Sequence, residues 1–503
     1  MRNTKLQRAI ALIMVVIFLV CGGTVTAGAK GNDGDSALDS IKELLNAISY
    51  NEYQKLEVFT EAENATSSVL IPGVDGVYTN IAGDIVAPGN EVIKVDSALE
   101  KEYASEEKMW DDIIGADNTP YKVDITDDNG KSAVGLYLPD SGITEWTFNL
   151  DKTLKYNIQI EYYPVANKSA SIERIFMING KVPFAEARYL DISKVWTTPY
   201  PLAELELGKK QDADKIKSDA IKAGLEQVSI KTENGINYLV CQKPTVWTQS
   251  IADFVDTYDI RFFRDDVDNN EIRENLVQTP VWQTYSVKDS NGFVQEPFIF
   301  AIEPNEEGKA TISLEGVNEP IVISSITLTP ITEYQSYSDY SKKYSGKNDG
   351  EGVMKIEAEY FSAVSNQTIY ATSDTTSAAN SPVSTQKTYL NVVGGEKWQG
   401  VGQWIEYDFT VSKSGMYNIA MRYKQNVLDG MSVCRVLYLY SDNTISEGDD
   451  GYYDGVPFEE ATRLKFNFSD DWQSCKFADE NDKVFEFYFE EGVTYKLRAK
   501  PQV

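Results

Sequence analysis

Two parts of this 503-residue chain carry the same short motifs in the same order, and this internal repeat restricts the fold more than any other feature. The closest match joins Gly-Lys-Val-Pro-Phe at 180–184 to Gly-Val-Pro-Phe at 455–458, each followed by Glu and Ala. Other landmarks recur in one order: Glu-Ala-Glu (61–63 and 357–359), a tryptophan run (144–148 and 403–407), Tyr-Asn-Ile (156–158 and 417–419) and a later tryptophan (Trp196 and Trp472). Such a pattern indicates a duplicated structural module.

Apolar and polar residues alternate within each copy, in short runs separated by Gly, Asn, Asp or Pro. The runs are 144–150, 155–163, 171–178, 311–316 and 321–328 in the first copy, and 403–411, 416–423, 434–440, 463–468, 484–489 and 494–499 in the second. This alternation is typical of half-buried antiparallel strands, and many short strands favour a β-sandwich. The sequence therefore predicts a mainly β chain of two tandem sandwiches, with hairpin turns at Asp151–Tyr156 and Ser412–Tyr417.

Three segments depart from the strand pattern. Ser36–Ser49 has apolar residues at helical spacing, Leu202–Leu225 is rich in Lys, Glu, Asp and Ala, and Ile331–Gly350 is polar and ends in glycine. These compositions indicate an amphipathic helix, a helical insertion and a linker. The predicted organisation is a helical segment at 30–50, a first module at 51–332 with an insertion at 199–258, a linker at 333–352 and a second module at 353–503.

The first 29 residues have the features of a secretory signal peptide. Basic Arg2, Lys5 and Arg8 precede the apolar run 9–20, and small residues follow near Ala27. The apolar run is shorter than the ~20 residues that span a bilayer. Cys21 offers lipid anchoring as an alternative, but Val20 stands where a lipoprotein signal has a small residue. We therefore expect a secreted or extracellular, cell-surface protein.

The composition excludes several classes of function. The chain has no histidine, so catalysis by a Ser-His-Asp triad and zinc sites with His ligands are excluded. A formal net charge of −30 disfavours nucleic acid as a partner. Without Cys21, three cysteines remain, of which Cys434 and Cys475 fall in the second module and could pair, while Cys241 stands apart.

Longer motifs in both copies resemble a known protein family. They are IEYYPVANKSASIERIFMINGKVPF (160–184), DDVDNNEIRENLVQTPVWQ (265–283) and EPIVISSITL (319–328) in the first copy, and LNVVGGEKWQGVGQWIEYDFTV (390–411), GVPFEE and FSDDWQ in the second. The chain resembles the N-terminal galactose-binding-like β-sandwich region of bacterial extracellular solute-binding proteins of ABC transporters. The resemblance implies jelly-roll modules like those that bind carbohydrate. The family's transport-type domain is not in this sequence, so the resemblance does not assign solute delivery to a permease.

The same resemblance implies a structural calcium ion in each module. In jelly-roll carbohydrate-binding modules, the opening Glu-Ala-Glu strand commonly helps to hold calcium, which prefers oxygen ligands. The implied ligands are Glu61 and Glu63 in the first copy and Glu357 and Glu359 in the second. The alternative is that these carboxylates face solvent on an alternating strand.

Sugar recognition needs an aromatic platform and a few fixed polar groups. Trp398 stands in the Gly-rich run 394–400, where a core role is not expected, and Arg435 could bond a sugar or a carboxylate. Trp146 and Trp404 stand in alternating strands and are predicted to be core. The full set of predicted ligand-binding residues is Trp398, Arg435 and Trp472 in the second copy and Arg174, Trp196 and Trp282 in the first.

These observations predict an extracellular, non-catalytic protein that binds an oligosaccharide or polysaccharide, within an ABC-type sugar uptake system. One alternative is a pair of structural modules that position a partner domain or contact a permease and bind no sugar. Another is an ancillary part of a glycoside hydrolase, since two carboxylates suffice for that chemistry. If one copy alone binds a sugar, we expect it to be the second.

Overall fold

A computed structural model describes residues 47–96, 110, 119–168, 170–199, 202–207, 212–294, 296–331, 333–377, 380–427, 429–441 and 455–502. Ile48–Val503 form one compact unit, and that unit is described below. The predicted signal peptide at 1–29, the acylation alternative at Cys21 and nearly all of the predicted helix at 36–49 lie outside the described residues. The fold is mainly β with few helices, as predicted. Among the described residues, no helix has the length and apolar character needed to cross a membrane.

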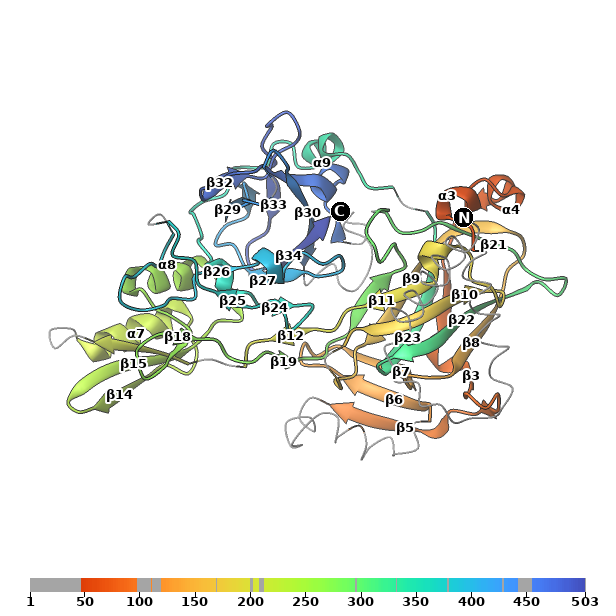
Figure 1. The fold of residues 1–503 in the computed structure, drawn as a ribbon, viewed down its shortest axis with the longest axis horizontal. Helices are drawn as coiled ribbons and strands as arrows, with labels where there is room; N and C mark the ends of the chain where they lie inside the picture. Colours follow the sequence, from red (N-terminus) through yellow and green to blue (C-terminus); the bar gives the residue numbers. More distant parts are fainter. Residues whose placement is uncertain are drawn as a thin grey trace, which may run out of the picture. The chain divides into compact units, whose positions relative to one another are not determined.

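Two sheets enclose one apolar core in the first part of the chain, which we call the first sandwich (Figure 1). Strands of both sheets contribute fully buried residues to this core, among them Trp146, Ile160 and Ile326. One sheet contains β1 (Glu63–Asn64), β2 (Val69–Pro72), β5 (Gly89–Asp96), β6 (Tyr121–Thr126), β7 (Ser132–Leu138), β9 (Leu154–Tyr163), β20 (Gln283–Ser286), β21 (Phe300–Ile302) and β23 (Ile321–Thr329). The other contains β3 (Val77–Thr79), β4 (Ile85–Val86), β8 (Ile143–Asn149), β10 (Ile172–Ile178), β11 (Tyr189–Ile192) and β22 (Lys309–Asn318).

A second apolar core lies under the sheets of the later residues, which we call the second sandwich. Its residues include Phe409, Leu437 and Phe487, all buried. The larger sheet contains β12 (Trp196–Thr197), β16 (Val246–Trp247), β19 (Val277–Gln278), β24 (Ala363–Val364), β27 (Ile405–Phe409), β30 (Val433–Ser441), β31 (Leu464–Phe466) and β34 (Tyr495–Gln502). Smaller pairs are β25 (Ala371–Thr372) with β26 (Val392–Val393), β28 (Gly415–Tyr417) with β33 (Phe487–Phe489), and β29 (Ala420–Tyr423) with β32 (Gln473–Lys476).

The two sandwiches share a block of four strands in the same spatial order. The order is β11-β10-β22-β8 in the first and β31-β30-β34-β27 in the second. The register agrees as well, because Arg174 of β10 pairs with Leu190 and Arg435 of β30 pairs with Leu464. A short 3-10 helix follows the shared Val-Pro-Phe motif in each copy, η2 (Ala185–Ala187) and η6 (Glu459–Arg463). Arg174 and Arg435 therefore occupy equivalent positions in the repeat.

The two predicted hairpin turns are connections between sheets instead. β8 bonds to β22 and β3, whereas the following strand β9 belongs to the opposite sheet. In the second copy β27 bonds to β24 and β34, and the following β28 pairs with β33. The prediction of hairpins at 151–156 and 412–417 is therefore wrong. Alternation along a strand indicates which face is buried, but it does not identify the strand's neighbour.

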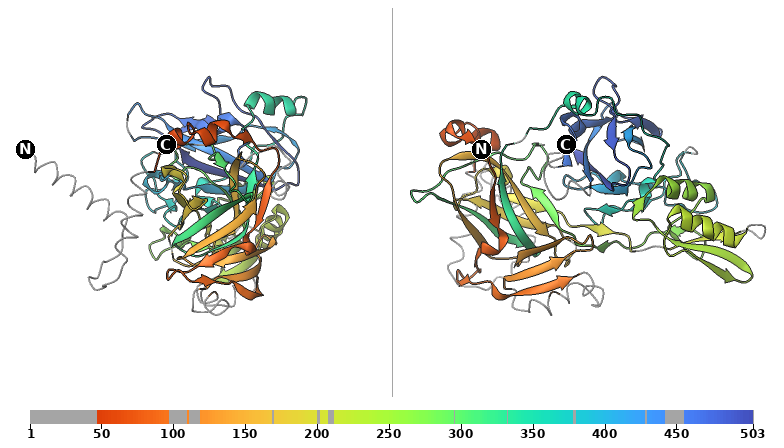
Figure 2. Two further views of the ribbon diagram at one scale, coloured as in Figure 1. Left: turned by 90° about the vertical axis from the view of Figure 1, so that its right-hand side faces the viewer. Right: turned by 180° about the vertical axis from the view of Figure 1, so that it is seen from behind.

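A short helix opens each copy and docks through two tyrosines. These helices are α3 (Tyr50–Tyr53) and α9 (Tyr337–Lys343), each capped by the serine that precedes it. The Tyr50 and Tyr53 hydroxyls accept bonds from backbone N–H groups at 3.0 and 2.9 Å, and those of Tyr337 and Tyr340 do so at 2.9 Å each. The segment predicted as a linker at 333–352 thus contains the opening helix of the second copy. Figures 1 and 2 show α3, with α4 (Glu57–Glu61), in red at one end of the first sandwich.

The predicted insertion at 199–258 contains a three-stranded sheet and two helices. Leu202–Leu207 is strand β13, which pairs with β15 (Ile236–Gln242), and β15 pairs with β14 (Ser229–Glu233). Helices α7 (Ala213–Ala223) and α8 (Gln249–Tyr258) follow β13 and β16, and all these elements lie together in Figure 1. The prediction of helix at 202–207 is wrong, because Ala203 and Leu207 are buried on one face at strand spacing. The insertion's core residues cluster with those of the second sandwich.

Candidate functional site

Trp398 and Arg435 form a stacked pair on the second sandwich. Trp398 follows the 3-10 helix η4 (Gly395–Lys397) in the loop between β26 and β27. Gly394 and Gly395 have φ values of 111° and 61°, a conformation that glycine adopts without strain and that shapes this turn. The Arg435 side chain comes from β30, and its guanidinium carbon lies 4.5 Å from the centre of the Trp398 ring. This is a cation–π contact between two half-buried side chains.

The pair has one hydrogen-bond acceptor, the Cys434 carbonyl, within the part of the chain that the structure describes. The Trp398 indole N–H is buried and has no partner there. Arg435 donates one bond, from Nη1 to the Cys434 carbonyl at 2.8 Å, and no described carboxylate pairs with it. Burial lowers the pKa of Arg435 to about 10. Each unmet buried donor costs about 1–3 kcal/mol, so an acceptor brought here by a ligand would be stabilised.

Arg174, the equivalent of Arg435 in the first sandwich, has its acceptors within the fold. Its side chain is 1% exposed. Its Nη1 donates to the carbonyls of Glu173 and Asn318, and its Nη2 donates to those of Pro139 and Glu319, at 2.8 to 3.2 Å. The four N–H groups of Nη1 and Nη2 are thus bonded within the fold, and the side chain is buried away from solvent. We therefore assign Arg174, predicted as a ligand-binding residue, to the scaffold.

Trp196 and Trp282 are also buried, with 5% of each side chain exposed. The Trp282 indole N–H donates to the Ile125 carbonyl at 3.2 Å, inside the first sandwich. Trp196 belongs to β12 and packs in the same apolar cluster as Trp398, in the second sandwich. Neither ring offers a face to a ligand, so the predicted sugar contacts at these positions are not supported. Trp146 and Trp404, predicted to be core, are 0% and 3% exposed, which confirms that prediction.

Trp472 is half-buried and belongs to a polar group of loops on the second sandwich. Its indole N–H donates to Asp374 Oδ2 at 3.0 Å, and Lys424 Nζ lies 3.9 Å from the same oxygen. Two asparagines, Asn380 and Asn391, donate to the Asp374 carbonyl. The Trp472 N–H is thus already bonded, in contrast to that of Trp398. Trp472 stays a predicted ligand-binding residue through its ring alone.

Tyr370 lies beside the Gly-rich loop and is contacted by two cations, one of them Lys397 from that loop. The guanidinium carbon of Arg273 is 3.4 Å from the centre of the Tyr370 ring, and Nζ of Lys397 is 5.5 Å from it. Hydrogen bonds from Arg273 and then Lys397 lower the pKa of Tyr370. Sequence reasoning missed these residues. Arg273 is far from the Gly-rich loop in the sequence, and no local pattern indicates that the fold brings it there.

The four glutamates implied as calcium ligands do not converge. Glu63 bonds to Lys152, Glu357 to Lys355 at 2.6 Å and Glu359 to Arg261 at 3.0 Å, while Glu61 is exposed at the end of α4. Within the described ranges, no group of three or more acidic or cysteine side chains could hold a metal ion. A calcium site needs six to eight oxygen ligands. The residues present therefore do not fit the implied calcium site.

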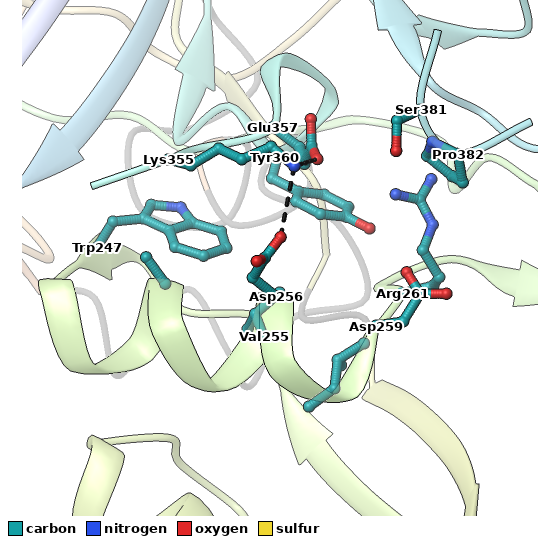
Figure 3. Close-up of a pocket in the computed structure, with 12 residues that line it drawn as sticks. Trp247, Val255, Asp256, Asp259, Arg261, Lys355, Glu357, Tyr360, Ser381 and Pro382 are labelled. Atoms are coloured by element: carbon teal, nitrogen blue, oxygen red, sulfur yellow. Dashed lines mark ion pairs between the residues drawn. The ribbon is translucent and has the colours of Figure 1, made fainter. Parts of the chain in front are cut away.

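A small cavity of about 60 Å³ lies between α8 and the segment that precedes β24 (Figure 3). Asp256 and Lys355 face each other across it, 3.5 Å apart. On its wall, Arg261 is bonded to Glu271 at 2.9 Å and to Glu359. Such a volume holds a few water molecules but not a sugar ring. Its lining residues include Trp247, Asp256, Asp259, Arg261, Lys355, Glu357 and Tyr360.

The cysteines of the described residues are free thiols. Cys434 lies in β30 of the larger sheet, whereas Cys475 lies in β32, which pairs with β29. The disulfide bond between Cys434 and Cys475, which the sequence allowed, is therefore not formed. Burial raises the pKa of Cys241 to about 12, which makes it unreactive at neutral pH.

Comparison with known proteins gives no family. No family model and no curated protein matches the chain. Among solved structures, it is similar to a xanthan lyase of Paenibacillus, with 10% identity over 76% of this chain and 24% of the lyase, at a TM-score of 0.14. It is also similar to the catalytic domain of Agl-KA, with 7% identity over 58% of this chain and 33% of that one, at a TM-score of 0.17. These scores are too low to support an argument about fold or function.

Proposed function

We propose that the chain is a non-catalytic carbohydrate-binding protein whose binding site lies on the second sandwich. The observation that carries this proposal is the pair of Trp398 and Arg435, in which Arg435 has one bond, to the Cys434 carbonyl, and no carboxylate partner in the described fold. An aromatic ring can cover the C–H face of a sugar, and unpaired donors can bond its oxygens.

The finer architecture belongs to the same proposal. We take the two sandwiches to be tandem galactose-binding-like jelly rolls, and their shared four-strand order supports this. We also propose an extracellular location, on the strength of the signal-peptide pattern, and a role in capturing glycans for an ABC-type uptake system, on the strength of the family resemblance.

Titration of the full mature chain with a panel of neutral and acidic oligosaccharides tests the proposal. We expect weak binding, with a Kd of about 0.01–1 mM, because the site is a loop surface and not an enclosing pocket. Trp398→Ala should abolish binding, whereas Trp282→Phe, which changes a buried ring, should not. Absence of binding to every oligosaccharide by the folded protein would contradict the proposal.

A structural role is the second candidate, and the first sandwich favours it. Arg174, which is equivalent to Arg435, and the buried Trp282 both donate hydrogen bonds to backbone carbonyls of this sandwich. Residues of this sandwich also contact the second one, where Ser193 accepts from the Trp404 indole at 3.2 Å and Lys288 donates to Tyr438 at 3.2 Å. If glycan binding is lost only when substitutions lie in the second sandwich, then the first sandwich has a structural role and supports the second.

A further inference from the structure

We infer that the Trp398–Arg435 site selects saccharides that carry a carboxylate, such as those containing uronic acids. This inference rests on the proposed function and adds the chemical class of the ligand. It follows from the kind of group that is missing at the site, from the geometry of the donors, and from the charges around them.

The missing group is an anion. Three other cations with largely buried side chains have a carboxylate partner: Lys194 with Glu319 at 2.8 Å, Arg261 with Glu271 at 2.9 Å and Arg498 with Glu406 at 2.7 Å. Arg174 is bonded instead to four backbone carbonyls, of which Arg435 has only one equivalent, at Cys434. Arg435 has no carboxylate partner among the described residues, although the chain contains 77 acidic residues. A buried charge is stabilised when it is paired and hydrogen-bonded. A ligand carboxylate would supply the partner that the other three cations already have.

The donor geometry suits a planar anion. A guanidinium has five N–H groups in one plane, and it binds carboxylates through two parallel hydrogen bonds. The bond to the Cys434 carbonyl uses Nη1, so the remaining edge of the Arg435 plane is not bonded within the described fold. The contact with the Trp398 ring holds the guanidinium carbon 4.5 Å from the ring centre.

Local positive charge offsets the negative charge of the whole protein. A net charge of −30 repels anionic ligands at long range. Arg273 and Lys397 are exposed and bond to Tyr370, and Lys397 precedes Trp398 in the chain. Lys397 therefore adds a cation to the loop that carries Trp398. Added salt screens the long-range repulsion more than the bonded contact, so it should not weaken binding.

The test compares an oligogalacturonate with its methyl ester, which has the same sugar chain without the charge. Isothermal titration of the full mature chain should give about 10–100-fold tighter binding of the acid form, the equivalent of a charge-assisted bond of about 1.5–3 kcal/mol. Arg435→Gln should remove this preference, so that the acid form binds no more tightly than the ester. Arg435→Lys should keep part of it, because the charge remains while the paired bonds are lost.

Controls separate the outcomes. Lys309→Gln removes an exposed cation on the first sandwich and should leave the preference intact, which excludes an effect of net charge. Equal binding of acid and ester would overturn the inference while leaving the proposed function. No binding of either form, or of any neutral oligosaccharide, would overturn both. Binding of acetate or sulfate as tight as that of the oligogalacturonate, and unaffected by Trp398→Ala, would overturn the inference in favour of a free-anion site.

Discussion

Arg174 and Arg435 hold the same place in two copies of one strand arrangement, yet their surroundings differ. Arg174 bonds to four backbone carbonyls and is buried, whereas Arg435 bonds to one carbonyl and stacks on Trp398. Under the proposed function, the same side chain serves stability in one copy and recognition in the other. Equivalence of position in a repeat does not imply equivalence of role, because the role depends on which acceptors the surrounding loops provide.

The phenylalanines of the shared Val-Pro-Phe motif, Phe184 and Phe458, should contribute equally to the stability of the two copies. Phe184 and Phe458 are fully buried, and each lies 4.8 Å, between ring centres, from an equivalent phenylalanine, Phe298 or Phe485. Phe184→Ala and Phe458→Ala should each lower the free energy of unfolding by about 3–5 kcal/mol, since each leaves a cavity. Urea denaturation would measure this. A large loss for one substitution and none for the other would break the structural equivalence of the two copies.

Substitution of Arg174 should lower the stability of the protein, whereas substitution of Arg435 should affect ligand binding and leave stability nearly unchanged. Arg174→Met leaves four buried carbonyls without a donor and should cost about 3 kcal/mol of unfolding free energy. Arg435→Met removes a half-buried cation without a carboxylate partner, and should change stability by less than about 1 kcal/mol in either direction. Thermal melting of the two variants, measured in parallel, gives the comparison. Equal losses would show that Arg435 is also a scaffold residue.

The helices that open the two copies, α3 and α9, should contribute equally to stability through their tyrosine hydroxyls. Tyr50→Phe and Tyr337→Phe each remove a hydroxyl that accepts a backbone N–H bond, at 3.0 and 2.9 Å. Each should cost about 1 kcal/mol, because a buried N–H loses its acceptor while the ring still packs. Differential scanning calorimetry can resolve such shifts. If Tyr337→Phe has no effect while Tyr50→Phe does, then α9 acts as a linker and not as part of the second sandwich.

Patterns local in the sequence predicted much of this fold. Alternation indicated most of the longer strands and the burial of Trp146 and Trp404. The motif shared by Ser49-Tyr50-Asn51-Glu52-Tyr53 and Ser336-Tyr337-Ser338-Asp339-Tyr340 could have revealed the paired opening helices, but the polar composition around 331–350 favoured a linker. The placement of Trp196 was beyond such reasoning, because β12 is two residues long and its sheet partners β19 and β24 come from distant segments.

Only the part of the candidate site that depends on local sequence could be predicted, as was true of the fold. A tryptophan flanked by glycine, lysine and glutamine indicated an exposed loop, and Trp398 does lie in one. The burial of Arg174 depends on carbonyls more than a hundred residues away, at Asn318 and Glu319, and no local pattern carries that information. The cations around Tyr370 are likewise brought together by the fold.

The most direct test of this account follows the indole N–H signals of the eight tryptophans by NMR while oligogalacturonate is added. Trp398→Phe and Trp282→Phe would assign the two signals that matter. The Trp398 signal should shift, because the ligand binds beside this ring and its cation partner Arg435. The Trp282 signal, from an N–H already bonded to Ile125, should stay in place. An unmoved Trp398 signal in a titration where binding is detected would contradict the account.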